Sequence, residues 1–407
     1  MAERPIPAVI LGGWENAVSV ARTLWRAGVP VDVLADQLTD CPVRHSRARR
    51  RYVPRGRRET LAAHWLGWLD GASAPAVLLP CSDEALEFIA RHRGPLEAVG
   101  HRPIESDDSA VLAVLDKQAS YAIARAAGIP APLTAMVSTP DELAASELPF
   151  PCGVKPVHSH RFRRLYPVEQ KGGVLMDAEH ARRVLEPILA QDCPMLLTEV
   201  IAGPDDSYRS YFTFIDGDGE PLLHFTKRKL RQYPPHFGLG TYHLTEWNAE
   251  VADLGLRFAR AAGLRGIVNV EFKRDIRDGQ LKLVECNPRF TQANEQLRVA
   301  GVDLARLAYN RLAGLPSPAV SSFTEHLAMW LPFNDLRALR AYRRSGELSI
   351  GAWAATLAHR QVLPLFAFDD PRPSFWWWRA RTTALASDAA RRLTRARRPL
   401  PVTNPYA

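Results

Sequence analysis

The sequence predicts an α/β domain built on a parallel sheet, followed by an α+β region of antiparallel hairpins with interleaved helices. Two observations lead to this fold class. Apolar strand-like runs alternate with helical spacing over the first hundred residues, and pairs of strand-like segments separated by glycine-containing turns follow later. The 407 residues, 46% hydrophobic and 24% charged, suit a globular protein of about two to four domains, which excludes disordered and fibrous classes.

The first elements form a βαβ pattern. Residues 8–11 are an apolar run ended by Gly12-Gly13, helical spacing continues to Gly28, and residues 29–34 and 76–79 are the next expected strands. The text after the first strand is GGWENA, which lacks the later glycines of a dinucleotide-binding GxGxxG turn. We therefore expect a Rossmann-like domain with a structural or substrate-binding role rather than a nicotinamide or flavin site.

The character of the chain changes at residue 107. A helix from Lys117 to Ala127 ends at Gly128-Ile129-Pro130, and a strand lies around Val154-Lys155. The other expected elements are strands at 195–200, 208–215, 221–226, 267–273 and 281–285, and a helix at 250–262.

The net charge of +8 is not spread along the chain. Residues 371–407 hold eight arginines and one acid, so this tail carries +7 and the rest about +1. No basic stripe crosses the main domains, which argues against a nucleic-acid function. Only seven of the 52 basic residues are lysines, so a lysine is an uncommon choice here.

The cysteines and apolar runs bear on location. Five cysteines at long spacings, without CxxC, are typical of a reducing compartment. The N-terminus has no signal-like apolar run, and no window reaches the roughly 18 apolar residues of a membrane span. We expect a cytoplasmic protein.

Two neighbouring segments, VNVEFKRD and LKLVECNPRF, carry the strongest chemical signal. Alternate residues of a strand share a face, so Glu271 projects from one face of the first segment, while Glu285 and Asn287 share a face of the second. Adjacent carboxylates repel unless a cation lies between them, and these oxygen ligands suit Mg²⁺ or Mn²⁺. Arg289 would then reach a metal-bound phosphate and stabilise a phosphoryl group in transfer. The alternative, an exposed face of alternating charge, leaves the neutral Asn287 unexplained.

The loop between these segments decides whether the two glutamates meet. A two-residue Asp278-Gly279 turn would place Glu271 opposite Cys286. A three-residue loop from Arg277, with Gly279 in the left-handed conformation, would place Glu271 opposite Glu285. We predict the three-residue loop.

These residues resemble the magnesium-binding end of the ATP-grasp superfamily, with a glutamate on one strand and LVECNPR on the next. The order of the other motifs agrees: Asp116-Lys117 before Gly128-Ile129-Pro130, the lysine of GVKP, and LTEVIAG at 197–203. The text from AVILGG to NPRF, about three quarters of the chain, resembles the carboxylate-amine ligase branch that includes D-aspartate ligase.

The resemblance implies a domain order. A Rossmann-like pre-ATP-grasp domain (1–106) would precede a two-lobed ATP-grasp domain. The small lobe would span 107–198, and the large lobe, with the metal site, 199–318. A C-terminal extension with a basic, tryptophan-rich tail would follow at 319–407.

The resemblance also implies phosphate contacts. Lys155 from a strand and Lys117 from a helix would contact phosphate oxygens, where a compact ammonium fits; the alternative for Lys117 is a solvated residue at a helix start. After the strand lysine the chain departs from the superfamily, because HSHRFRRLYPVEQKGG replaces a glycine- and serine-rich loop. Cationic side chains of this loop either contact phosphate or form a solvated charge run: His158, His160, Arg161, Arg163 and Arg164.

The hinge motif implies contacts with adenosine. Glu199 would accept a hydrogen bond from the adenine amino group, and backbone groups near Val200 and Ile201 would bind the ring edge. Asp206 stands where related ligases hold the ribose hydroxyls, although the adjacent Asp205 is not separable from it in the sequence. The alternative for both acids is a surface turn.

A basic segment, TKRKLRQYPPHFGLGTYH at 226–243, lies between the hinge and the metal strands. Its positive charge suits the acceptor carboxylate and the phosphoryl group during transfer. The candidates are Lys227, Arg228, Arg231 and a glycine turn at 238–241. The alternative is an ordinary basic strand followed by a solvent loop.

The resemblance implies an enzyme that joins a small-molecule carboxylate to an amine through an acyl phosphate, with ATP and Mg²⁺ or Mn²⁺, releasing ADP and phosphate. Two alternatives are a carbamoyl-phosphate-synthase-like ligase that uses ammonia or carboxyphosphate, and a protein that binds ATP without catalysis. The sequence leaves open a homo-oligomer. It also leaves open whether the tail contacts an anionic membrane surface or folds back over the enzyme.

Overall fold

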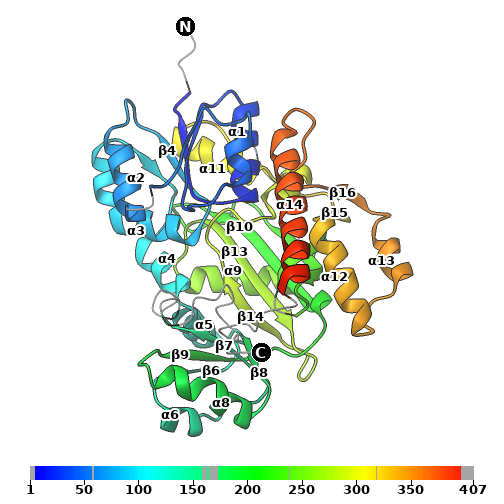
Figure 1. The fold of residues 1–407 in the computed structure, drawn as a ribbon. Helices are drawn as coiled ribbons and strands as arrows, with labels where there is room; N and C mark the ends of the chain where they lie inside the picture. The colour runs from blue at the N-terminus through cyan, green and yellow to red at the C-terminus, as the bar shows by residue number, and fades with distance from the viewer. Residues whose placement is uncertain are drawn as a thin grey trace. The chain divides into compact units, whose positions relative to one another are not determined.

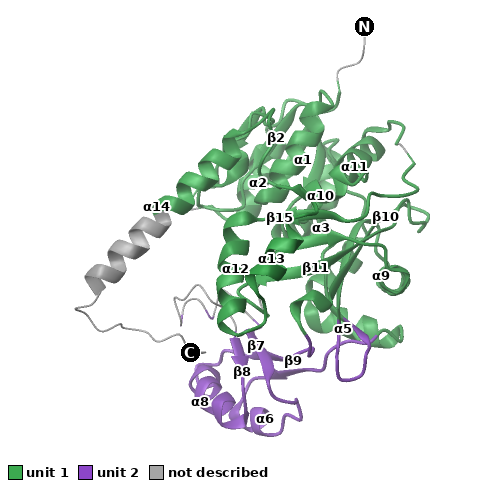
Figure 2. Ribbon diagram, turned by 90° about the vertical axis from the view of Figure 1, so that its right-hand side faces the viewer, with its two compact units in different colours: residues 1–129, 204–273, 283–383 green, residues 130–203, 274–282, 384–407 purple. Residues whose placement is uncertain are grey.

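Figure 1 shows a computed structural model of the chain, which describes residues 5–56, 59–157, 162, 165, 173–236, 238–317 and 319–395, with side chains in the last helix as far as residue 383. The chain divides into two compact units (Figure 2). Unit 1 contains Met1–Ile129, Pro204–Lys273 and Leu283–Thr383, and unit 2 is built on Pro130–Gly203 and Arg274–Lys282. The four domains expected from the sequence divide the chain more finely and stay a prediction.

Unit 1 begins with a five-stranded parallel sheet in the order β3-β2-β1-β4-β5 (Figure 1). Ala8 pairs with Val31 on one side and with Val77 on the other, in parallel. The two neighbours of the first strand, like that strand, are buried throughout, as expected where helices cover both faces. The predicted βαβ pattern is therefore confirmed. The elements are β1 (Ala8–Leu11), α1 (Glu15–Arg26), β2 (Val31–Leu34), β3 (Arg51–Val53), α2 (Leu61–Asp70), β4 (Val77–Pro80), α3 (Asp83–Ala98) and β5 (Arg102–Pro103).

The glycine pair after β1 allows a close approach of three strand ends. Gly12 and Gly13 have φ values of +68° and +94°. A Cβ atom on Gly12 would lie 2.5 Å from Ser82 Oγ, and the Gly13 N–H donates to Asp36 Oδ2 at 3.2 Å. Glycine is needed here because side chains from the neighbouring strand ends fill the space.

The larger sheet belongs mainly to unit 1 and has the order β14-β13-β10-β11-β12-β15-β16. Its pairs from β13 to β15 are antiparallel, while β15 and β16 are parallel. Helix α9 packs on β10, where Gly255 lies against the Tyr211 ring. The elements are β10 (Tyr208–Ile215), β11 (Phe225–Tyr233), β12 (Leu239–Thr245), α9 (Ala249–Ala261), β13 (Gly266–Arg274), β14 (Leu281–Cys286), β15 (Leu327–Trp330) and β16 (Arg360–Val362).

Two sequence expectations for this sheet are wrong. The strand expected at 221–226 begins only at Phe225 and continues to Tyr233. The turn expected at 238–241 instead forms the start of β12, where Leu239 pairs with Tyr233. The basic segment is thus a long inner strand, because its lysines find aromatic and acidic partners across the sheet.

The helices that follow complete unit 1. Asp116 caps α5 by accepting the Ala119 N–H at 2.9 Å, which fixes Lys117 as the first residue of that helix. None of the described helices is both long and apolar enough to cross a membrane. The helices are α4 (Asp108–Leu115), α5 (Lys117–Ala126), α10 (Asn294–Val299), α11 (Leu304–Ala313), α12 (Pro332–Arg344), α13 (Ile350–Thr356) and α14 (Arg372–Arg395).

Unit 2 is a four-stranded antiparallel sheet in the order β6-β9-β7-β8, packed against two helices. Its core joins Cys152 and Leu197 of the sheet to Leu185 and Ile188 of one helix. The elements are β6 (Thr134–Val137), α6 (Pro140–Ala144), β7 (Cys152–Pro156), β8 (Gly173–Leu175), α8 (Ala178–Leu189) and β9 (Met195–Glu199).

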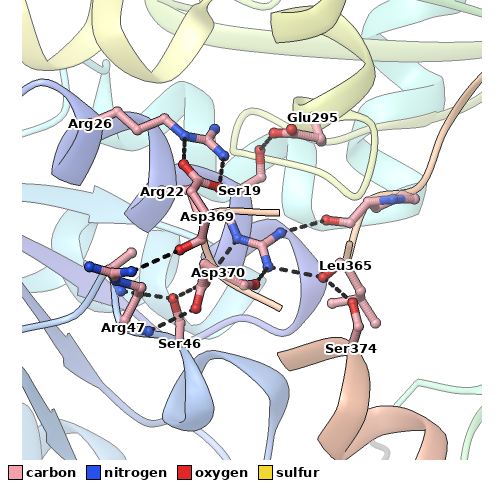
Figure 3. A network of polar contacts seen from close by, with 12 residues as sticks. Ser19, Arg22, Arg26, Ser46, Arg47, Glu295, Leu365, Asp369, Asp370 and Ser374 are labelled. Atoms are coloured by element: carbon pink, nitrogen blue, oxygen red, sulfur yellow. Dashed lines mark hydrogen bonds and ion pairs between the residues drawn. The ribbon is translucent and has the colours of Figure 1, made fainter. Parts of the chain in front are cut away.

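A buried network ties the segment before α14 to α1 (Figure 3). Arg22 is fully buried, and its Nε lies 3.0 Å from Asp370 Oδ2. It also donates to the carbonyls of Leu365 and Asp370 at 2.9 and 2.6 Å. Ser46 Oγ donates to the same carboxylate at 2.6 Å. The network anchors the chain immediately before its last helix.

The first turns of α14 are folded back on unit 1. Trp377 is only 5% exposed and belongs to the main hydrophobic core. The Trp376 ring stacks on His45 at 5.0 Å between centroids and meets Trp14 edge-on. The fold-back alternative therefore holds for the start of the tail.

Candidate active site

The hairpin of β13 and β14 brings Glu271 and Glu285 into one cluster. Asn269 and Asn287 exchange both backbone hydrogen bonds, at 3.2 and 2.7 Å, which makes them a directly opposed pair. Glu271 and Glu285 stand two residues further along the two strands, where Lys117 and Lys229 each interact with both carboxylates. Their direct opposition across the hairpin stays a prediction.

The loop that sets this register differs from the prediction. Gly279 is left-handed, with φ of +71°, as predicted. However, the Asp275 N–H donates to the Gln280 carbonyl at 2.9 Å, so the loop holds four residues, 276–279, instead of three. A register shift of one residue between this pair and Asn269/Asn287 absorbs the extra residue.

The Glu271 side chain lies on the same face of the sheet as Lys227 and Lys229 of the basic strand β11. It is opposite Ser210 of β10, whose Oγ lies 3.4 Å from Glu271 Oε1. Lys229 of β11 places its Nζ 3.5 Å from Glu271 Oε2. The carboxylate is thus held by one hydroxyl and one ammonium.

Glu285 is held by its own cation. Lys117 Nζ lies 3.6 Å from Glu285 Oε2, and the Asn287 amide donates to Oε1 at 3.1 Å. Burial works to raise the pKa of Glu285, but Lys117 and Asn287 outweigh it and hold that pKa below its ordinary value. Burial likewise works to lower the pKa of Lys117, but Glu285 raises it above its ordinary value. Both groups are therefore charged at neutral pH.

These residues fit a divalent cation that also binds water or phosphate. Glu271, Glu285 and Asn287 supply two carboxylates and one amide, which are oxygen donors of the kind that Mg²⁺ takes. Among the described residues, no group of three His, Cys, Asp or Glu side chains is arranged around a metal position, so other ligands would complete the shell. The two lysine contacts, at 3.5 and 3.6 Å, already show that each carboxylate accepts a positive charge.

Three of the seven lysines share this face of the sheet. Lys229 Nζ lies 4.0 Å and Lys273 Nζ 5.1 Å from the centroid of the Tyr208 ring. Lys227 is opposite Ser210 and is 4% exposed, with its Nζ 3.0 Å from His243 Nδ1. Burial lowers the pKa of Lys227 to about 8. The face therefore places three amine side chains around Glu271, one of them with a lowered pKa.

Arg228 lies on the other side of the sheet. Because alternate strand residues point to opposite faces, its side chain turns away from Lys227 and reaches Glu246, with NH1 3.7 Å from Oε2. Arg231 is buried against Asp335, with Nε 2.8 Å from Oδ1. The structure thus brings Lys227 together with the glutamates but not these two arginines.

Arg289 links the hairpin to the parallel sheet. Its NH2 donates to Asn287 Oδ1 at 3.0 Å, and its Nε lies 2.6 Å from Asp83 Oδ1, at the first residue of α3. The guanidinium therefore lies beside the predicted metal ligands and at the carboxyl edge of the parallel strands. This edge is where ligands bind in open α/β sheets.

Glu199, at the end of β9 in unit 2, has a carboxylate held by three donors. It is 9% exposed. Arg277 donates to Oε1, Lys282 Nζ lies 3.3 Å from the same atom, and the Leu133 N–H donates to Oε2 at 3.0 Å. Oε2 accepts from the Leu133 N–H alone among these donors, so it keeps a second acceptor site.

Lys155 and the hinge residues also lie in unit 2. Glu199 pairs with the residue three positions before Lys155 on β7, so the two side chains point to opposite faces of that sheet. Lys155 is half-buried. The Val200 carbonyl accepts from Arg277 at 3.3 Å, and Ile201 is buried. The nucleotide roles of these residues stay predictions.

The structure separates the two neighbouring acids after the hinge. Asp205 is buried and accepts from Gln232 Nε2 at 2.7 Å, from the His236 N–H at 2.8 Å and from the Tyr342 hydroxyl. Asp206 is exposed. Asp205 thus stabilises the fold around β11, and of the two acids only Asp206 is exposed.

Sequence reasoning missed several residues of the site and predicted others that lie outside the described part of the chain. Lys229, Lys273 and Ser210 contact or neighbour Glu271, and the scarcity of lysine would have pointed to the first two. The predicted cationic loop falls on residues that the structure does not describe: His158, His160, Arg161, Arg163 and Arg164.

The comparisons with known proteins fit this geometry, although no protein-family model matches the chain. D-aspartate ligase from Enterococcus faecium is 24% identical over 242 residues, 56% of this chain and 57% of that protein. The large chain of carbamoyl phosphate synthase from Gemmatimonas aurantiaca is 24% identical over 259 residues, 60% of this chain and 23% of that protein. The chain thus spans little more than half the length of the first relative and less than a quarter of the second.

Solved structures show the fold. A β-γ-ATP complex of biotin carboxylase from Campylobacter jejuni matches with a TM-score of 0.60 and 14% identity, over 79% of this chain and 74% of that one. L-amino acid ligase from Bacillus licheniformis matches with a TM-score of 0.56 and 17% identity, over 76% and 75%. The chain has the ATP-grasp fold. The predicted resemblance to carboxylate-amine ligases is confirmed. The predicted mixed α/β fold class is confirmed as well.

Proposed function

We propose that this ATP-grasp protein is an ATP-dependent ligase that joins a carboxylate to an amine through an acyl phosphate and releases ADP and phosphate. The observation that carries the proposal is the cluster of Glu271 and Glu285, each held by a lysine at 3.5 to 3.6 Å, with Asn287 and Arg289 alongside. Binding alone would not need this concentration of charge around one hairpin.

The proposed reaction has two steps. A carboxylate oxygen of the acid attacks the γ-phosphorus of ATP and ADP leaves; the amine nitrogen then attacks the acyl carbon, phosphate leaves and the nitrogen loses a proton. Glu271, Glu285 and Asn287 would hold Mg²⁺ or Mn²⁺, which supplies positive charge to the phosphate oxygens when bound. Arg289 would stabilise charge on the transferring group, and Lys227 with Lys229 would orient the acid.

The nucleotide contacts are proposed on the motifs and on local geometry. Lys155 and Lys117 would contact phosphate oxygens, and the exposed Asp206 would hold the ribose. Adenine would bind at the backbone near Val200 and Ile201. The proposed order of parts is a Rossmann-like pre-ATP-grasp domain, the two ATP-grasp lobes and the C-terminal extension.

A second candidate within the same chemistry is a ligase that uses ammonia and carboxyphosphate. The similarity to the carbamoyl phosphate synthase large chain, 24% identity over 259 residues, supports this second candidate. Bicarbonate would take the place of the organic acid, and ammonia that of the amine.

The test is ADP release by the purified full chain with Mg²⁺-ATP. One arm supplies a panel of acids with amines, including amino acids; a second supplies bicarbonate and ammonia; a third omits acceptors. ADP release that needs both an acid and an amine, with a new amide found by mass spectrometry, supports the proposal. Turnover only with bicarbonate and ammonia would select the second candidate, and tight ATP binding without turnover in any arm would leave an ATP-binding protein.

A matched pair of variants ties the activity to the hairpin. Glu271→Gln removes one charge at the proposed metal site, while Glu220→Gln makes the same change in the exposed turn after β10, where the side chain is 70% exposed. Activity lost in the first and kept in the second is the expected result. Equal activity in both would contradict the assignment of the site.

A further inference from the structure

Four large aromatic side chains are exposed around the start of α14. Phe366, Phe368, Phe375 and Trp378 are 39%, 93%, 70% and 46% exposed. The Phe366 and Phe368 rings meet edge-on at 5.0 Å. Phe366 and Trp378 line the same apolar pocket of about 100 Å³, and Phe375 precedes Trp378 by one helical turn. These four residues form one continuous surface, here called the aromatic patch.

Buried contacts of the same helix keep the aromatic patch exposed to solvent. Trp377, between the exposed positions, is 5% exposed in the core, and Trp376 stacks on His45. Arg22 and Asp370 fix the chain immediately before the helix. Rotating the helix to hide Phe375 would expose Trp377, so the outward aromatics are a fixed property of this face.

The charge around the aromatic patch is positive. Arg372 and Arg379 are exposed on the same helix. The acids that precede the helix are already paired, Asp369 with Arg26 at 2.8 Å and Asp370 with Arg22 at 3.0 Å. Within the described residues, no carboxylate forms an ion pair with Arg372 or Arg379. From Pro371 onward the sequence adds eight arginines and one acid.

We infer that this face of unit 1 binds an anionic membrane surface. The aromatic patch enters the interface of one leaflet, where Trp and Phe are favoured, and the arginines contact lipid phosphates. Charge complementarity selects this occupant: a neutral apolar partner would match the aromatics but not the arginines.

Vesicle sedimentation of the full chain tests the inference. The probes are vesicles of phosphatidylcholine alone and of phosphatidylcholine with phosphatidylglycerol, at low salt and at raised salt. We expect binding to the anionic vesicles, little binding to the neutral ones, and weaker binding as salt rises.

A matched set of variants locates the contact. Phe375→Ser with Trp378→Ser should reduce the partition coefficient about tenfold or more, because two aromatic side chains no longer enter the interface. Arg372→Gln with Arg379→Gln should reduce it at least about fivefold for anionic vesicles only. Trp247→Ser is the control, since Trp247 is also 46% exposed but lies just after β12; it should bind like the wild type.

Three results would overturn the inference. These are no sedimentation of the wild type with anionic vesicles, equal binding by the aromatic double variant and by Trp247→Ser, or a dimer in light scattering that the aromatic double variant alone abolishes. The last would assign the patch to a second copy of the chain. Circular dichroism and thermal unfolding of each variant keep a folding defect from being taken for lost binding.

Discussion

Two clusters of charged residues in unit 1 differ in how far they are buried and how completely their charges are paired. In the network of Figure 3, Arg22 and Asp370 are both fully buried, 3.0 Å apart, and the guanidinium also donates to three backbone carbonyls. At the hairpin, Lys117 and Glu285 are 34% and 40% exposed and 3.6 Å apart. A buried network whose charges are all paired stabilises the fold, whereas a part-exposed, loosely paired cluster can also bind a ligand.

The largest expected effect is a loss of stability when the buried pair of Arg22 and Asp370 is broken. Arg22→Met removes a buried cation and leaves Asp370 unpaired, so the free energy of unfolding should fall by about 3–5 kcal/mol. Urea denaturation of the full chain measures it. The control is Arg26→Met: its ion pair with Asp369 is 29% and 42% exposed, and its loss should cost less than about 1 kcal/mol. Equal losses in the two variants would mean that burial does not distinguish the pairs.

The accessible cluster should respond in activity and not in stability. Glu285→Gln is expected to lower ADP release about 100- to 1,000-fold, because it removes a ligand and a charge at the transferring phosphoryl group. The urea midpoint should stay near that of the wild type, since Lys117 and Glu285 are both part-exposed. A Glu285→Gln variant with a lower urea midpoint and wild-type ADP release would contradict this prediction, because Glu285 would then stabilise the fold without contributing to activity.

An effect of intermediate size is expected at the buried Lys227. Burial lowers the pKa of Lys227 from 10.5 to about 8, so the native state gives up this proton at a lower pH than the unfolded chain does. The native state is therefore penalised below pH 8, and the penalty shrinks as the pH rises from 8 to 10.5. Relative to Lys227→Met, the wild type should gain about 2 kcal/mol between pH 7 and pH 9.5 in urea denaturation. A constant difference across this range would show that Lys227 titrates normally.

The smallest effect separates the two neighbouring acids. Asp206→Asn should raise the KM for ATP about three- to tenfold without changing stability, because the exposed carboxylate would hold only the ribose. Asp205→Asn should instead lower the free energy of unfolding by about 1–3 kcal/mol, since Gln232, His236 and Tyr342 all donate to it. If Asp205→Asn changed only the KM, the two assignments would be exchanged.

The sequence predicted what depends on local pattern. Alternation along two short strands was enough to bring Glu271 and Glu285 into one cluster, since Lys117 and Lys229 each interact with both, even though the loop is one residue longer than predicted. The first parallel strands were likewise predicted, because apolar runs act within a few positions.

The sequence did not predict what depends on distant contacts. Asp205 is buried because Tyr342, 137 positions later, donates to it, and Arg22 is satisfied by a residue 348 positions away. Lys229 was missed because its strand lacks apolar alternation and is stabilised by Tyr208 and Glu271 on neighbouring strands. Partners of this kind are known only once the sheet is assembled.

The most direct test of the central claim follows the oxygen of the acid. With the acid and amine found by the ADP-release panel, the acid is labelled with ¹⁸O in its carboxylate, and the released phosphate is analysed by mass spectrometry. An acyl phosphate requires that one labelled oxygen pass from the carboxylate to phosphate for each amide formed. Phosphate free of label, with all remaining label in the amide or the acid, would contradict the proposed ligase chemistry.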